Sequence, residues 1–73
     1  RFMRNVLIAM GNSGDLDLAP RAEQLLGDPS PLVRAMAVWA LAQLVEAEHI
    51  KSLRAKHLTN ETDAAVKAEW ATQ

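Results

Sequence analysis

The stretch from residue 49 to residue 57 combines both histidines of the chain with three basic side chains and no acidic one. Its ionisable residues are His49, Lys51, Arg54, Lys56 and His57. Such a cluster could bind phosphate, and its histidines could bind a metal ion. At about 100° per helical residue, however, Lys51 and Lys56 point roughly 140° apart. The two histidines lie two turns apart without a third ligand, so the pattern favours neither a phosphate patch nor a metal site.

Residues 11–14, Gly-Asn-Ser-Gly, have the spacing of the nucleic-acid clamp of KH domains. That clamp needs flanking β-strands, and none is predicted here. We therefore interpret the segment as the turn that ends a helix, with Gly14 as a left-handed cap. Nearby polar side chains are candidates for contacts with phosphate, bases or protein, or are ordinary solvated residues: Arg1, Arg4, Asn5 and Asn12.

The composition excludes several kinds of chemistry. The 73 residues contain no cysteine, which removes disulfides, thiolate catalysis and cysteine-ligated metal from this chain. No nucleophile, base and orienting group occur together, so we predict no catalytic residue. The net charge of −1 gives no general attraction to nucleic acid or membrane, and no apolar run is long enough to span a bilayer. We expect a cytoplasmic protein, and we interpret the chain, which begins inside a helical pattern, as part of a longer one.

Apolar periodicity predicts five helices and no strand. We expect them over residues 2–10, 15–26, 31–45, 46–58 and 64–73. Pro20 fits the first turn of the second helix, and either Asp28 or Ser30 can cap the third. In the fourth, Ile50, Leu53 and Leu58 form the apolar side, with His57 semi-buried among them.

The helix over residues 31–45 has apolar residues on nearly every side, so it should lie in the middle of a stack. Its main core stripe is expected to contain Val33, Met36, Ala37, Ala40, Leu41 and Leu44. Trp70, on the last helix, also falls at a core position.

The helices follow an internal repeat of two helices per unit. Residues 3–15 align with residues 34–46 at an offset of 31, and Val33-Arg34 aligns with Val66-Lys67 at an offset of 33. A period slightly above 30 is typical of an α-solenoid. We therefore predict one all-α domain of helix-turn-helix units: residues 1–14 are the second helix of a truncated unit, 15–45 a complete unit, and 46–73 a third, partly truncated unit.

The repeat resembles the short HEAT-like repeat of the type associated with bilin lyases. The residues that carry this likeness are Gly14-Asp15, Pro20, Leu26, Asp28-Pro29, Pro31, Val33-Arg34, Ala37, Ala40-Leu41 and Leu44. The third unit departs from the pattern, because it lacks both turn prolines. In such repeats the resemblance implies that Asp28 and Arg34 pair within and between units, which would be a structural role.

A narrower resemblance rests on residues 4–14, Arg-Asn-Val-Leu-Ile-Ala-Met-Gly-Asn-Ser-Gly, on the Asp-Pro-Ser-Pro-Leu-Val-Arg turn, and on residues 66–70. Together they are similar to the C-terminal HEAT-like region of bacterial epoxyqueuosine reductases. These oxidoreductases use 4Fe-4S clusters and cobalamin to complete queuosine in tRNA. Their catalytic residues and cofactor ligands have no counterpart here, so the resemblance implies a non-catalytic accessory domain without a cofactor of its own.

Trp39 is the strongest candidate for a binding residue. It is expected on the outward side of its helix with Ala35, Ala42 and Gln43. The aligned residue one unit earlier is Ile8, which shares a side with Arg4 and Asn12. Adjacent second helices would then present Arg4, Ile8, Asn12, Trp39 and Gln43 together, as an interface does. The alternative is that Trp39 lies under a neighbouring loop.

Three functions are consistent with these features. In the first, the chain docks on the catalytic domain of an epoxyqueuosine-reductase-type enzyme and contributes to tRNA binding. In the second, it is a general HEAT-repeat scaffold from another bacterial protein, which binds a protein through the Trp39 side. In the third, it caps a longer solenoid. We also expect weak self-association of the chain, because Phe2, Leu7 and their neighbours lack the covering helix of their own unit.

Overall fold

The computed structural model describes residues 2–73, without the side chain of Phe2. It contains five α-helices and one short 3-10 helix. They are α1 (Phe2–Ser13), η1 (Leu16–Leu18), α2 (Ala19–Leu25), α3 (Pro31–Leu44), α4 (Ala47–Leu58) and α5 (Ala64–Ala71). No strand occurs in the described part of the chain. The predicted all-α solenoid architecture is therefore confirmed.

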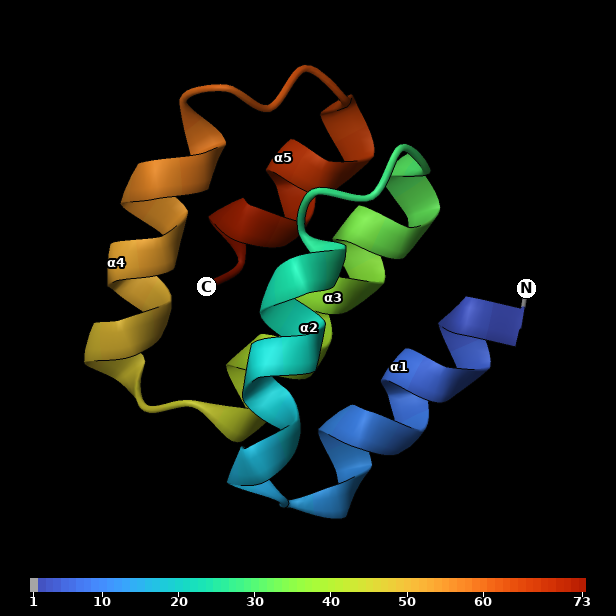
Figure 1. Ribbon diagram of the computed structural model, residues 1–73. Coiled ribbons are helices and arrows are strands. Elements are labelled where there is room, and N and C mark those ends of the chain that lie inside the picture. Colours follow the sequence, from blue (N-terminus) through green and yellow to red (C-terminus); the bar gives the residue numbers. More distant parts are fainter. Residues whose placement is uncertain (1) are drawn as a thin grey trace.

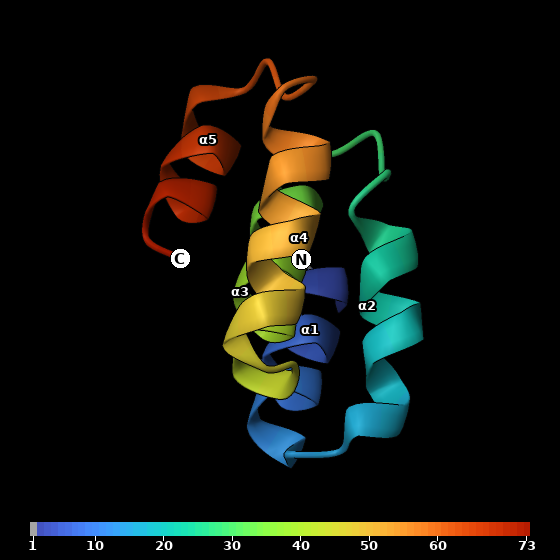
Figure 2. The same cartoon turned by 90° about the vertical axis from the view of Figure 1, so that its left-hand side faces the viewer.

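The helices form two layers, and α3 lies at the centre (Figures 1 and 2). The second helices α1, α3 and α5 lie side by side, with α3 between the other two. The first helices α2 and α4 cover the other side of this layer, and α2 packs closely on α3. This arrangement explains why α3 is apolar on nearly all sides, because three helices pack closely around it.

The second predicted helix is divided by Pro20. The expected helix over residues 15–26 is instead the 3-10 turn η1 followed by α2, with Pro20 in the first turn of α2. Proline has no N–H to donate to the carbonyl four residues earlier. The chain therefore closes a tighter turn first, in which the Leu18 N–H donates to the Asp15 carbonyl at 3.0 Å. The Asp15 carboxylate caps this turn by accepting a hydrogen bond from the Asp17 N–H.

The first helix is longer than predicted. Gly11 and Asn12 lie inside α1, which ends only at Ser13. Gly14 then adopts a positive φ of 69°, so the predicted left-handed cap is confirmed. Gly11 therefore does not end the helix. Its role lies in the packing of α1 against α3.

The core runs through all five helices. Four residues of the predicted α3 stripe are buried, namely Val33, Ala37, Ala40 and Leu41, whereas Met36 and Leu44 are only half-buried. Val38 is also completely buried, because α3 is covered on more than one side. The full set of buried apolar residues is Leu7, Ala19, Ala22, Leu25, Leu26, Val33, Ala37, Val38, Ala40, Leu41, Ile50, Leu53, Val66 and Trp70.

Two predictions about burial, one for Trp70 and one for Leu7, have opposite outcomes. Trp70 is 1% exposed, which confirms its predicted core position. Leu7, which was expected to lack a cover, is 0% exposed, so that expectation was wrong. α1 packs closely along α3, and Leu7 belongs to the same apolar core as the buried residues of α3. The side chain of Phe2 lies outside the described residues.

Candidate functional site

The two turns that start α3 and α5 have the same capping chemistry. At α3, the Asp28 carboxylate accepts from the Ser30 N–H at 2.9 Å, and the Ser30 hydroxyl accepts from the Val33 N–H at 3.4 Å. At α5, the Glu61 carboxylate accepts from the Asp63 N–H at 3.0 Å. Asp63 in turn caps the helix, as its carboxylate accepts from the N–H groups of Ala65 and Val66.

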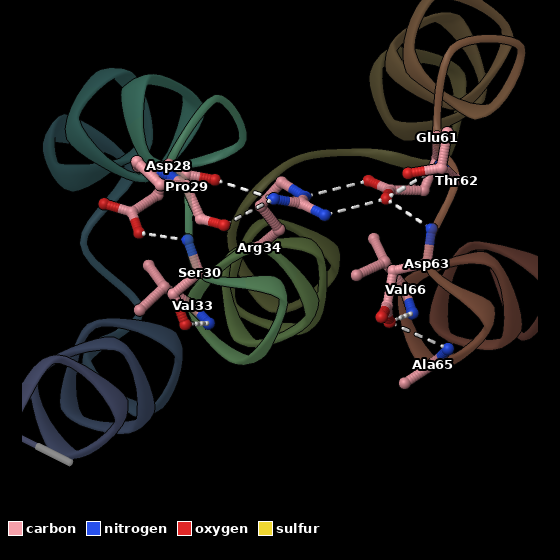
Figure 3. A network of polar contacts seen from close by, with 10 residues as sticks. All are labelled: Asp28, Pro29, Ser30, Val33, Arg34, Glu61, Thr62, Asp63, Ala65 and Val66. Carbon is pink, nitrogen blue, oxygen red and sulfur yellow. Dashed lines mark hydrogen bonds and ion pairs between the residues drawn. The ribbon is translucent and has the colours of Figure 1, made fainter.

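Arg34 joins these two turns (Figure 3). Its Nε and Nη2 each lie 3.0 Å from a different carboxylate oxygen of Glu61, in a two-bond pair. Its Nη1 donates to the carbonyl oxygens of Asp28 at 2.9 Å and Pro29 at 3.1 Å. The side chains of Arg34 and Glu61 are only 18% and 9% exposed. A planar guanidinium suits this bridge, because its donors match a carboxylate and two carbonyls at fixed angles.

The expected pairing of Asp28 with Arg34 therefore takes a different form. The two residues are joined through the main-chain carbonyl of Asp28, since its carboxylate bonds to Ser30. The ionic partner of Arg34 is Glu61, which the sequence reasoning did not single out. One signal could have identified it, because Glu61 aligns with Asp28 at the offset of 33 residues.

The ion pair shifts the titration of both groups. The hydrogen bonds from Arg34 are the main reason why the pKa of Glu61 lies below its ordinary value, and the Asp63 N–H adds to the effect. The same bonds with Glu61 raise the pKa of Arg34. The Glu61 carboxylate and the Arg34 guanidinium that join the two turns are therefore both charged at neutral pH.

The two histidines lie in different surroundings. The ring of His57 stacks on that of Trp70, with centroids 6.0 Å apart and an angle of 8° between the planes. Its predicted semi-buried position is consistent with this contact, and burial is the main cause that lowers its pKa. His49 is exposed near the start of α4, where its Nε2 lies 3.6 Å from Oε2 of Glu23.

No metal site is present in the part of the chain that the structure describes. Within residues 2–73, no three His, Cys, Asp or Glu side chains are grouped so that they could hold an ion. Among the same residues, no helix has the length and apolar character needed to cross a membrane. Arg1 lies outside the described residues.

Trp39 lies against α1. A Cβ atom on residue 11 would overlap Cζ3 of Trp39 and come within 3.0 Å of its Cη2. The indole is therefore half-buried over the bare backbone of Gly11, in place of the exposed position that the sequence led us to expect. The indole rests on a helix, three residues beyond the aligned residue Ile8.

The five candidate binding residues lie on the two packed helices α1 and α3, and we call them the second-helix surface. Arg4, Asn12 and Gln43 are exposed, and Ile8 and Trp39 are half-buried. Arg4, Ile8 and Asn12 follow one another at intervals of four residues on α1, and Gln43 follows Trp39 by four on α3. Because Trp39 reaches over to Gly11, three residues after Ile8, the two rows meet. The surface thus has partly exposed apolar residues flanked by polar ones.

The stacked helix pairs define the class of protein, a helical repeat scaffold of the α-solenoid type. The sequence profile of the family described as HEAT repeats matches residues 2–73. The chain therefore belongs to the HEAT repeat family. A search of the curated proteins finds no significant match, and a search of the solved structures finds none.

The ion pair predicts an acid-sensitive fold. Because the folded-state pKa of Glu61 lies below 4.5, its ionised form stabilises the fold above that pH, and this contribution is lost as the pH falls through the folded-state value. Glu61→Gln should lower Tm at pH 7 by about 5 °C or more, and the difference from the parent chain should shrink below pH 4. Thermal melts followed by circular dichroism test this. Glu48→Gln, an exposed glutamate on α4, is the matched control, and an equal loss in the control would contradict the assignment.

The seat of Trp39 gives a second prediction. Gly11→Ala should push the indole outward, with a net cost of about 1 kcal/mol, because overpacking outweighs the better helix propensity of alanine. Acrylamide quenching of tryptophan fluorescence should increase, and this signal reports mainly Trp39 because Trp70 is buried. Gly27→Ala is the control, since the nearest heavy atom to its new Cβ would be 3.7 Å away. Equal quenching in all three proteins would show that Trp39 does not rest on Gly11.

Proposed function

We propose that this scaffold binds a protein partner through the second-helix surface. The observation that carries the proposal is the position of Trp39, an amphipathic aromatic side chain that is half-exposed over Gly11 of α1, on helices that also carry exposed polar residues. Binding surfaces concentrate their affinity in such aromatic anchors, while a polar border orients the partner. Trp39 is seated on Gly11 before any partner arrives, so little side-chain freedom would be lost on binding.

We propose further that the partner is the catalytic domain of an epoxyqueuosine-reductase-type enzyme, carried by the same parent protein. The support is the resemblance of residues 4–14 and 66–70 to the C-terminal region of that family. The chain would then serve as an accessory domain in queuosine modification of tRNA. Iron–sulfur clusters and cobalamin would belong to the parent enzyme, and the chain would supply no catalytic residue and no cofactor ligand.

In the same proposal tRNA meets the edge of this surface. Arg4 is exposed and can contact a phosphate, and exposed amide side chains such as Asn12 can contact a base or the backbone. Trp39 offers a ring face on which an unpaired base can stack. With a net charge of −1 on the chain, tRNA contact would be local and would supplement the binding by the catalytic domain.

A second candidate is a general HEAT-repeat scaffold from another bacterial protein. The repeat architecture and the family membership support it equally well, and the same surface would then bind an unrelated protein. The parent gene separates the two candidates. Cysteine-rich cluster motifs upstream of this segment favour the enzyme, and further HEAT repeats upstream favour the general scaffold or a capping role.

Docking on the catalytic domain can be measured in trans. The chain should bind the separate catalytic domain of its parent enzyme, and Trp39→Ala should weaken this binding at least tenfold, because it removes the anchor of the surface. Leu32→Ala is the control, since Leu32 is a 50% exposed apolar residue that is not part of the second-helix surface. Isothermal titration calorimetry gives the dissociation constants. Equal losses for the two variants, or no binding by the parent chain, would contradict the docking proposal.

The tRNA contact is tested in the full-length parent protein. Arg4→Gln together with Trp39→Ala should weaken tRNA association several-fold, and the loss should be larger at low salt, because a phosphate contact is screened by added ions. Filter binding at two salt concentrations measures it. Arg21→Gln is the control, because Arg21 is exposed on α2 and bonds only to Gln24 among the described residues. Unchanged tRNA affinity in the double variant would remove tRNA from the proposal and leave the protein docking intact.

A further inference from the structure

The helix α4 carries a groove that none of the contacts described above uses. The groove encloses about 470 Å³ and is lined by Lys51, Arg54, Ala55, Leu58 and Thr59. Lys51, Ala55 and Leu58 follow one another at intervals of four and three residues, and Arg54 precedes Leu58 by four, so these side chains share one side of the helix. Ala55 and the half-buried Leu58 are its apolar members, and Lys51 and Arg54 are its basic ones. Within residues 2–73, neither Lys51 nor Arg54 has an ion-pair partner.

The groove faces away from α2. His49 marks the α2 side of α4, because it lies 3.6 Å from Glu23 of α2. At 100° per residue, Lys51 and Leu58 point about 160° and 180° away from His49. The basic and partly apolar groove of α4 therefore lies on the side of this helix opposite to α2, and Figure 2 shows how the two helices lie.

A surface of opposite character precedes α2. Leu16 in η1 is 61% exposed, more than the other exposed large apolar residue, Leu32. The exposed residues Asp15 and Asp17 stand on either side of it. The turn is held in place, since the Asp15 carboxylate accepts from the Asp17 N–H at 3.0 Å. We call Asp15, Leu16 and Asp17 the acidic knob. It lies at the base of α2, to the right of α4 in Figure 2.

We propose that a second copy of this chain inserts its acidic knob into the α4 groove. The groove carries two cations beside apolar side chains, and the knob carries an apolar side chain beside two carboxylates, so opposite charges can pair across the contact and fix its orientation. An exposed leucine of this kind is a common mark of an interface. The net charge of −1 opposes the approach of two copies only weakly.

The contact is directional. The groove faces away from α2 whereas the knob lies at the base of α2, so one knob–groove contact leaves a knob and a groove free at the two ends of a pair. Self-association through them produces short open chains with increasing concentration and no closed dimer. It also leaves the second-helix surface free, because Trp39 belongs to neither the knob nor the groove.

Sedimentation of the 73-residue chain over a range of concentrations tests the proposal. The average mass should rise with concentration, and added salt should reduce it. Leu16→Ser should weaken association at least tenfold, and so should the double variant Lys51→Glu with Arg54→Glu. Leu32→Ser is the matched control and should associate like the parent chain, because Leu32 is the other exposed large apolar residue. Circular dichroism checks that all variants keep their helix content.

Mixing the two defective variants supplies the decisive result. Leu16→Ser keeps its groove, and the groove variant keeps its knob, so the mixture should form one-to-one pairs although each variant alone stays monomeric. Trp39→Ala should associate like the parent chain. The proposal is overturned if the parent chain stays monomeric, if the mixture does not pair, or if Trp39→Ala or Leu32→Ser abolishes association. None of these results bears on docking to a catalytic domain, which is measured separately.

Discussion

The fold depends on a single guanidinium that links consecutive turns. Arg34 lies on α3. Its side chain donates to the carbonyl of Asp28 in the turn before α3 and pairs with the Glu61 carboxylate in the next turn. The packing of α3 between α1 and α5 fixes where the helices lie in the stack. Apolar packing alone tolerates sliding of one helix along another, because it is not directional. The guanidinium bonds have fixed angles and therefore set the register between units.

Helices, caps and core positions could be predicted from the sequence, whereas contacts between units could not. The helices, the left-handed cap at Gly14 and the core position of Trp70 follow from periodicity and from conformational preferences within a few residues. The partner of Arg34 is 27 residues away, so its identity depends on how two turns align in space. The complete burial of Val38 likewise depends on how many neighbours surround α3. The sequence correctly placed Pro20 in the first turn of a helix but extended that helix back to residue 15, where the structure has the separate turn η1.

The candidate surface shows the same limit in one pair of residues. Sequence reasoning places Trp39 and Ile8 on the same side of neighbouring helices, and the structure places Trp39 against Gly11, three residues after Ile8. The sequence predicted an outward-facing Trp39, because residue spacing does not show how closely the neighbouring helix approaches. Glycine at position 11 lets the indole approach the backbone of α1, which lowers its exposure. The side of a helix can thus be predicted from spacing, whereas the depth of a side chain depends on the size of its neighbour.

The matching turns at Asp28 and Glu61 give the stack of units a fixed direction along the chain. Each turn presents a carboxylate at its start and a cation six residues later, and the first of these cations, Arg34, reaches the carboxylate of the following turn. Lys67 stands where the next cation would stand. A unit of 33 residues, from Asp28 to Asn60, can therefore be copied in tandem only in this order. In such a duplication, Arg34 would face the aspartate that begins the copied unit in place of Glu61. Aspartate is one methylene shorter than glutamate, so the register would be retained and the adjoining turns would lie closer together.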